Sequence, residues 1–472
     1  MSFVSPLFFI FIPVFLLGTI CTRGNVRILF YIVMSYLFYA YSFPPYVIIL
    51  FFSSFVDFHV GRRISRTENK HKKYMLLCVS IMVNIGLLFT FKYAGFFIRQ
   101  INDLRLCTAF TVPNLILPVG ISFYTFQTLS YTIDIYRNKI KPTSSFFDFA
   151  CYVAFFPQLV AGPIIRAAEF LPQLKKHVPL KRENTIRGME LVIQGFVKKL
   201  IFADNLARVV DEIFLNHSQY GGGVLWIGSL FYAMQIYCDF SGYTDIARGI
   251  GRILGFKFPH NFNWPYLSIS IREFWQNWHM SLSYWLRDYL YIPLGGSRVR
   301  VDRYLFNILF VFLLCGLWHG AGYNFIIWGI YHGLLVVGSK AAMSIRIISN
   351  LWSRVPGIVN IFFTFLVVTI GWVIFRVEKT NVAFLIIKKM LCIEGNDFFM
   401  GFVSIDNVSY LIPLFLFGAA LHIISYKLKY NIDGFSLMTN TYYPVRIVVL
   451  ALVITILMLS APNQRSFIYF RF

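Results

Sequence analysis

The chain has 472 residues, of which 57% are hydrophobic and only 14% are charged. Soluble domains are roughly half apolar and a quarter charged, so a soluble protein of this composition would be expected to aggregate. Lys and Arg outnumber Asp and Glu by 43 to 21, but the basic residues gather in short runs between apolar segments, which indicates the cytoplasmic loops of a membrane protein rather than a nucleic-acid-binding protein.

Apolar stretches of membrane-spanning length recur along the whole chain. The first runs from Phe3 to Ile20 with no basic residue before Arg23, so we expect a retained first helix rather than a cleavable signal peptide. The basic runs at 62–73 and 175–187 are expected in the cytoplasm, and the C-terminal tail is then expected outside. The predicted fold is all-α: one integral-membrane domain over residues 1–472, with roughly 11–13 membrane helices plus interfacial or re-entrant helices.

Motifs of several other chemistries are missing from the sequence. The 7 cysteines are scattered and include no C-x-x-C pair, so neither a disulfide framework nor a zinc ribbon is supported. There is no P-loop, no H-E-x-x-H zinc motif and no G-x-S-x-G nucleophile elbow. We therefore expect no metal site and no permanently bound cofactor, and the residues that bind any cofactor or donor are unknown at this stage.

A polar cluster interrupts the apolar run 224–255. Asp245 and Arg248 have the i,i+3 spacing of a helical ion pair, so structural pairing of two carboxylates with one arginine is the favoured interpretation. A proton relay is the alternative. The cluster consists of Tyr237, Asp239, Ser241, Tyr243, Asp245 and Arg248.

The segment 259–303 is rich in aromatic and charged residues at once, which is typical of an interfacial or re-entrant element. Ser270 and Glu273 have the spacing of a capping box, which predicts a helix start. At 100° per residue this helix would carry an apolar stripe, with His279 on the neighbouring polar stripe. An amphipathic anchor in the headgroup region is an equally good interpretation of this pattern. The apolar stripe would contain Ile271, Trp275, Trp278, Leu282, Trp285 and Tyr289.

The stretch from Tyr304 to Ser339 carries no charge, and as one helix it would be about 54 Å long, against a hydrocarbon core of roughly 30 Å. It must break, and the natural place is the segment 318–322, which puts His319 at the interruption. A neutral imidazole there can accept a proton from an attacking thiol or hydroxyl and return it to the leaving group. A core histidine bonded to a freed carbonyl is the alternative, and for His332 on the next helix we prefer that second interpretation.

Two long motifs resemble a known family. These are REFWQNWHMSLSYWLRDYLYIPLGGSR at 272–298 and GLWHGAGYNFIIWGIYHG at 316–333. Together they closely resemble the membrane-bound O-acyltransferase family, and the stretches at 117–137, 155–174 and 239–256 support the likeness over most of the chain. The resemblance is to the bacterial polysaccharide branch, which includes membrane proteins of alginate and peptidoglycan O-acetylation and of teichoic acid D-alanylation.

The resemblance implies a fold around a central tunnel. His319 matches the essential histidine of the family and His279 its second characteristic polar position. The implied function is to pass an acetyl group from a cytoplasmic donor, acetyl-CoA, across the cytoplasmic (inner) membrane, for O-acetylation of a peptidoglycan-like or alginate-like polysaccharide through a secreted or periplasmic SGNH-type O-acetyltransferase. The alternatives are D-alanyl transfer to teichoic acid and a non-enzymatic membrane transporter; no nucleic-acid partner is expected.

The chain ends in the tail motif 466–472, SFIYFRF, which resembles an FIYF-x-F ending of the same branch. The resemblance implies that Tyr469 accepts the acyl group with help from His319 and passes it to the secreted partner. A phenol suits such a relay because its ester is activated and because covalent catalysis divides one transfer into two. The alternative is an aromatic belt at the membrane surface.

Overall fold

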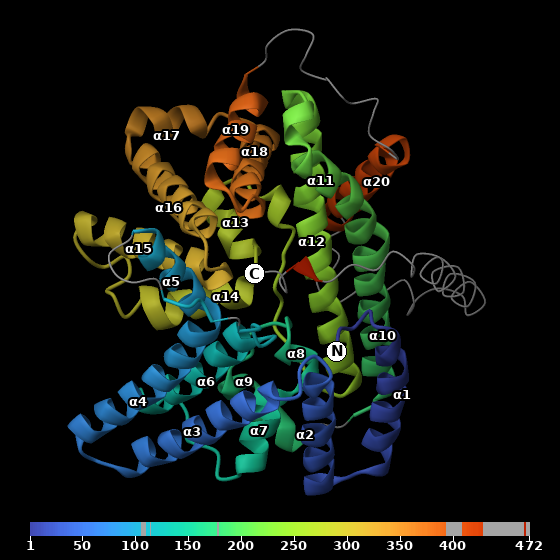
Figure 1. Cartoon of the computed structure of the whole chain (residues 1–472), viewed down its shortest axis with the longest axis vertical. Helices are drawn as coiled ribbons and strands as arrows, with labels where there is room; N and C mark the ends of the chain where they lie inside the picture. Colours follow the sequence, from blue (N-terminus) through green and yellow to red (C-terminus); the bar gives the residue numbers. More distant parts are fainter. Residues whose placement is uncertain (105–109, 114, 177–178, 393–407, 428–466, 469–472) are drawn as a thin grey trace. The chain divides into compact units, whose positions relative to one another are not determined.

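The computed structural model describes residues 1–104, 110–113, 115–176, 179–392, 408–427 and 467–468 (Figure 1). Within these residues the chain is helical, and the extended backbone forms only an isolated bridge between Phe262 and Trp278. The chain divides into two compact units: unit 1 comprises Met1–Val192 and Tyr243–Pro259, and unit 2 comprises Ile193–Gly242 and His260–Phe472.

Unit 1 holds the first nine helices and parts of two more. They are α1 (Pro6–Cys21), α2 (Gly24–Ala40), α3 (Tyr46–Arg66), α4 (Lys70–Leu88), α5 (Ala94–Asp103), α6 (Ile121–Tyr136), α7 (Phe146–Ala154), α8 (Phe156–Leu159) and α9 (Ala167–Lys176), with most of α10 (Arg182–Phe196) and the end of α12 (Gly222–Ile253). A π-helical turn, Phe89–Tyr93, joins α4 to α5.

A buried carboxylate lies where α3, α4 and α6 meet in unit 1. Asp57 accepts hydrogen bonds from the Ser80 hydroxyl at 2.6 Å and from the Asn84 amide at 2.7 Å. The Asn84 carbonyl oxygen in turn accepts from Ser53 and Thr128, each at 3.0 Å. We call these five residues the Asp57 network; among the described residues its donors are uncharged.

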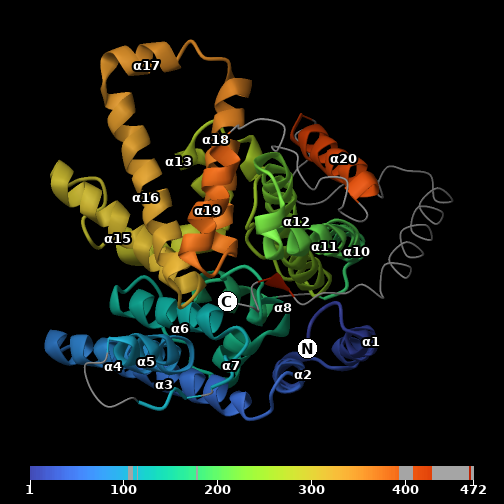
Figure 2. The same cartoon turned by 45° about the horizontal axis from the view of Figure 1, so that its top comes forward.

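Unit 2 contains the remaining helices. They are α11 (Asp204–Leu215), α13 (Ile271–Asn277), α14 (Met280–Leu286), α15 (Val301–His319), α16 (Tyr323–Ser344), α17 (Arg346–Trp352), α18 (Gly357–Arg376), α19 (Thr380–Leu391) and α20 (Val408–Lys427), with the end of α10 and most of α12. Figure 2 shows α17 linking α16 to α18, which pack along each other.

Four helical segments of the described chain are long and apolar enough to cross a membrane: Lys70–Asp103, Val301–His319, Tyr323–Ser344 and Gly357–Arg376. Three apolar helices are shorter, Pro6–Cys21, Gly24–Ala40 and Leu411–Lys427. Large apolar side chains on them are exposed, for example Ile10, Met82 and Ile358, as a lipid-facing surface requires. The prediction of an all-α membrane protein is confirmed, while the number of crossings stays a prediction.

Candidate active site

The uncharged stretch that had to break does so at the predicted place. α15 ends at His319, Gly320 is extended, and α16 begins at Tyr323. The two helices pack closely because glycines face each other: a Cβ at Gly316 would lie 2.2 Å from the Phe325 carbonyl oxygen, inside any allowed contact. His319 is thus held at the tip of a tight hairpin by residues within the same motif.

His319 is almost completely enclosed, with 4% of its surface exposed. Its ring lies edge-on to aromatic rings from three helices: Trp318 at 5.0 Å, Trp328 at 5.1 Å and Phe375 at 5.3 Å between centroids. Such packing fixes the imidazole in one orientation, which an acid–base group needs to meet its substrate.

The segment around His279 differs from the prediction of one amphipathic helix. The capping box is present, since the Ser270 hydroxyl accepts from the Glu273 amide at 3.2 Å and Glu273 accepts from the Ile269 amide at 2.8 Å. The helix that it starts ends at Asn277, however, and His279 adopts a left-handed conformation, φ 43° and ψ 54°, before α14. The expectation that His279 lies on a polar helix face was therefore wrong.

Backbone pairing with a neighbouring segment explains this break. The Asn263 amide donates to the Asn277 carbonyl at 3.0 Å, and the Met280 amide donates to the Asn261 carbonyl at 2.9 Å. These partners replace the helical hydrogen bonds that a turn through His279 would have made. Helical periodicity alone could not reveal competing partners 14 and 19 residues upstream.

The break turns His279 inward beside His319. His279 is 1% exposed, and its ring lies 4.6 Å from Phe240, 5.6 Å from Trp318 and 6.5 Å from His319 between centroids. His279 lies outside the candidate membrane spans, and burial lowers its pKa to about 3, so the ring is neutral at physiological pH. We call His279 and His319 the histidine pair; the structure brings these two predicted site residues together.

His332 occupies a separate aromatic environment on α16. It is fully buried, with Trp275 and Trp328 each at 5.0 Å between ring centroids. Neither ring nitrogen has a hydrogen-bond partner within the described residues. The core interpretation of His332 thus fits its packing, although the carbonyl partner expected for a core histidine is not found there.

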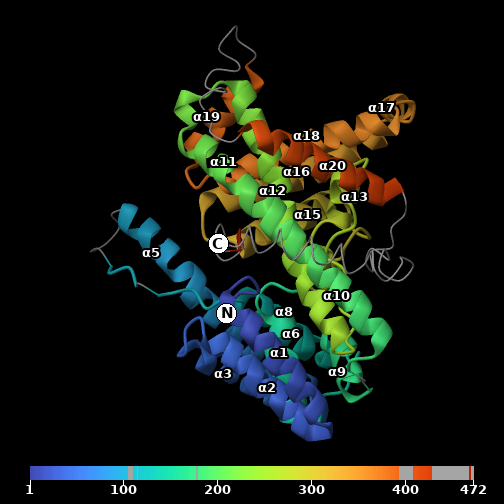
Figure 3. The ribbon, with the colours of Figure 1, turned by 90° about the vertical axis from the view of Figure 1, so that its right-hand side faces the viewer.

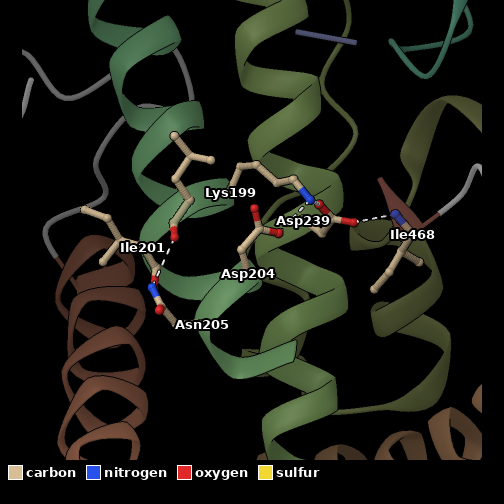
Figure 4. Close-up of polar contacts among 7 residues, drawn as sticks. Lys199, Ile201, Asp204, Asn205, Asp239 and Ile468 are labelled. Atoms are coloured by element: carbon tan, nitrogen blue, oxygen red, sulfur yellow. Dashed lines mark hydrogen bonds and ion pairs between the residues drawn. The ribbon is translucent and has the colours of Figure 1, made fainter. Parts of the chain in front are cut away.

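A second polar cluster lies on α12, the π-helical turn Val197–Ala203 and the first residue of α11, and Figure 4 shows its side chains converging. The Lys199 ammonium lies 2.8 Å from Asp204 Oδ1 and 2.7 Å from Asp239 Oδ1. All three side chains are at most 4% exposed. We call these residues the Lys199 cluster.

The predicted pairing inside α12 was half right. Asp245 and Arg248 do pair, at 3.6 Å, as their spacing indicated. Asp239 was expected to share the arginine, but its cation is Lys199. Sequence reasoning missed Lys199 and Asp204, although a lysine inside the apolar run 191–203 was an available signal, because a buried ammonium needs a carboxylate.

A close helix approach makes this pairing possible. A Cβ at Gly242 would lie 2.7 Å from the Gly195 carbonyl oxygen and 3.2 Å from the Lys199 amide nitrogen, so only glycine lets α12 lie this near to the end of α10 and the π turn (Figure 3). π-helical turns are rare and often mark functional sites.

Two residues of the C-terminal tail are described, and both are buried at the Lys199 cluster. The Ile468 amide donates to Asp239 Oδ2 at 2.6 Å. The Phe467 ring lies 5.9 Å from Phe240, the same ring that contacts His279. The predicted relay Tyr469, with the rest of the motif at 466 and 469–472, lies outside the described residues. The described residues also contain no metal-binding group of three or more His, Cys, Asp or Glu.

The chain matches known acyltransferases over most of its length. Residues 136–377 match the family model of the membrane-bound O-acyltransferase family. The probable alginate O-acetylase AlgI of Pseudomonas aeruginosa is 39% identical over 83% of this chain and 75% of its own. The peptidoglycan O-acetyltransferase of Helicobacter pylori is 33% identical over 100% of this chain and 97% of its own.

A more distant relative belongs to another reaction class. The teichoic acid D-alanyltransferase of Bacillus subtilis is 31% identical over 47% of this chain and 59% of its own. The family match contains His279 and His319, the helices that hold them and the whole Lys199 cluster. The chain is therefore a member of the membrane-bound O-acyltransferase family, and it is an O-acyltransferase.

Proposed function

We propose that this protein, acting as one integral-membrane domain, takes an acetyl group from a cytoplasmic thioester, acetyl-CoA, and delivers it across the inner membrane. The final acceptor is a hydroxyl of an extracytoplasmic polysaccharide, and a secreted SGNH-type O-acetyltransferase completes the transfer. The names of the relatives support this choice, since two of them are O-acetylating enzymes of alginate and peptidoglycan that match most of this chain. The D-alanyltransferase likeness covers 47% of the chain and supports D-alanyl transfer less well.

The histidine pair is the observation that carries the proposal. Two buried imidazoles lie 6.5 Å apart between centroids, in a wall of aromatic rings that keeps bulk water away from a thioester. General acid–base catalysis needs a group that accepts and returns a proton near neutral pH, and a neutral imidazole is suited to it. We assign His319 as the base and His279 as the second polar group, which orients the reacting carbonyl.

The proposed relay residue is Tyr469. In the first step the phenol oxygen bonds to the thioester carbonyl carbon and the carbon–sulfur bond breaks, while His319 takes the phenol proton and returns it to the sulfur. The products are acetyl-tyrosine and the free thiol. In the second step an acceptor hydroxyl bonds to the same carbon, and its proton goes to the departing phenolate. Tyr469 directly follows Ile468 in the sequence, and the Ile468 amide donates to Asp239.

The test is intact-mass analysis of the purified protein incubated with acetyl-CoA, followed by peptide mapping. Wild type should gain the mass of one acetyl group on the C-terminal peptide, and His319→Ala should form it at least about 100-fold more slowly. Tyr469→Phe should form none. His59→Ala, which alters an exposed histidine on α3, is the control and should behave as wild type.

Each variant separates one part of the proposal. If the acetyl adduct still forms in Tyr469→Phe, Tyr469 is not the relay, but acetyl-CoA is still supported as the donor. If the adduct forms at the wild-type rate in His319→Ala, the assignment of His319 as the base is wrong. If no adduct forms from acetyl-CoA under any condition while a D-alanyl donor gives one, the acetyl reaction is wrong.

A further inference from the structure

The Lys199 cluster has an unusual charge arrangement. One ammonium, that of Lys199, meets two carboxylates, Asp204 and Asp239, so this group of three has an excess of one acidic side chain. Burying such an excess is costly unless further donors reach it. Asp204 uses Oδ1 toward the lysine, and Asp239 divides its two oxygens, with Oδ1 toward Lys199 and Oδ2 toward the Ile468 amide.

The donor that meets Asp239 Oδ2 comes from the far end of the chain. Ile468 is 229 residues away from Asp239 in sequence, and its amide lies 2.6 Å from the carboxylate in a buried position. Hydrogen bonds to an ionised acceptor are shorter and about twice as strong as neutral ones. Because the contact uses a backbone amide, it fixes the position of the backbone at Ile468.

A ring contact joins this point to the histidine pair. Phe467 is 2% exposed and packs 5.9 Å from Phe240. Phe240 also contacts His279, at 4.6 Å between ring centroids, and His279 lies beside His319. Phe240 directly follows Asp239 on α12, so a single turn of helix both holds the tail amide and contacts the histidine pair.

We propose that the Lys199 cluster is a clamp for the C-terminal segment: Lys199 orients Asp239, Asp239 holds the Ile468 amide, and Phe467 seats on Phe240, so that the tail is fixed against the wall of the histidine pair. Asp239 and Lys199 are then positioning residues that act through the tail. This role in transfer rests on the proposed function, whereas the clamp itself does not require any acetyl chemistry.

Hydrogen–deuterium exchange of the full-length protein in detergent tests the clamp directly. The Ile468 amide, read in C-terminal peptides, should exchange slowly in wild type and about tenfold or more faster in Asp239→Ala. Asp239→Ala leaves Lys199 and Asp204 as a balanced pair, so the fold is expected to survive. Asp239→Asn keeps an acceptor oxygen and should restore part of the protection.

A matched control disrupts a different carboxylate of unit 2. Asp211 on α11 pairs with Arg376 of α18, an ion pair that involves neither Lys199 nor Asp239. Asp211→Ala should therefore leave the exchange of the Ile468 amide as in wild type, even if it lowers stability. Phe467→Ala supplies a variant from the tail side, where a substitution near the chain end does not open the helix bundle, and it should also accelerate exchange.

The two proposals fail in different ways. Unchanged Ile468 exchange in both Asp239→Ala and Phe467→Ala overturns the clamp, whatever the acetylation assay shows. Fast exchange together with normal acetylation confirms the clamp and overturns its role in transfer. If the clamp acts through the tail, Asp239→Ala should lower acetylation in the full chain but cause no further loss after deletion of residues 467–472; a further loss there would show that Asp239 acts independently of the tail.

Discussion

Asp57 in unit 1 and Asp239 in unit 2 are both removed from solvent, at 0% and 1% exposure, but their surroundings differ. Asp57 accepts from the side chains of Ser80 and Asn84 on the adjacent helix, and the Asp57 network closes on itself through Ser53 and Thr128. Asp239 faces an ammonium on one side and a backbone amide from the end of the chain on the other.

The difference separates a structural use of a buried carboxylate from a positioning use. Each hydrogen bond of the Asp57 network joins two of the helices α3, α4 and α6. The network therefore stabilises the packing of these three helices. In the Lys199 cluster one carboxylate oxygen of Asp239 instead accepts from the backbone amide of Ile468, 229 residues away in the sequence. The Lys199 ammonium lies on the other oxygen of the same carboxylate, at 2.7 Å, and hydrogen bonds that involve a charged group are stronger than neutral ones.

The largest expected effect is that of Lys199→Met, which leaves Asp204 and Asp239 buried without their cation. Breaking a buried ion pair from one side costs about 3–5 kcal/mol, so we expect the free energy of unfolding, measured by SDS titration from detergent micelles, to fall by that amount. The control is Lys340→Met on α16, which removes an exposed lysine whose ammonium lies 3.5 Å from the centroid of the Tyr304 ring. Such an exposed contact contributes about 0.5–1 kcal/mol. Equal decreases in the free energy of unfolding in the two variants would show that the Lys199 cluster does not stabilise unit 2 more than an ordinary lysine contact does.

Asp57→Asn should lower the free energy of unfolding by a smaller amount. It tests the structural role of the buried carboxylate in unit 1. Asn84 cannot flip, because its carbonyl oxygen already accepts from Ser53 and Thr128, so the new amide must keep its oxygen toward Asn84. Its NH₂ group then faces the Ser80 hydroxyl, which can accept only by turning its own hydrogen toward Thr132, 3.0 Å away. Replacing a charged acceptor by a neutral amide weakens the hydrogen bonds to it, at a cost of about 1–3 kcal/mol.

The same SDS titration measures that loss, and its control is Asp302→Asn, which changes an exposed ion pair with 71% of the aspartate side chain accessible and should cost less than about 0.5 kcal/mol. The acetylation rate of Asp57→Asn should stay at the wild-type value after correction for folded protein. A selective loss of acetylation would mean that the Asp57 network, too, has a role in the reaction.

The predictable parts of this molecule were those governed by short-range rules. The break at His319 followed from the length of an uncharged stretch against the thickness of a bilayer, and the start at Ser270 followed from a three-residue spacing. The features that could not be predicted from the sequence depend on contacts between residues far apart in the chain. The break at His279 depends on the backbone of 261–263, and the partner of Asp239 in the tail is 229 residues distant. Position in a motif singled out His279 as a site residue, which stays a prediction, whereas helical periodicity misplaced its side chain.

His332→Phe should have the smallest effect on stability and activity. It tests whether a buried polar side chain of unit 2 outside the histidine pair contributes to the reaction. The ring of His332 lies among Trp275, Trp328 and Tyr331, at 5.0–5.2 Å between centroids, and its nitrogens bond to no described residue. Phenylalanine keeps the ring shape and removes two polar atoms whose burial is costly. The free energy of unfolding should therefore change by less than about 1 kcal/mol, and the acetylation rate should stay near that of wild type.

The matched substitution is His319→Phe, which places the same ring at the proposed base. It should abolish acetylation while leaving the fold intact, because its aromatic neighbours accept either ring. A large loss of rate in His332→Phe, with unchanged stability, would extend the proton-handling site along α16 and would contradict the core role of that histidine. The same substitution is thus made at two positions that lie thirteen residues apart on one hairpin. Neither variant leaves a cavity, as an alanine variant would, so a difference in acetylation rate between them reflects the chemistry of the histidine and not its packing.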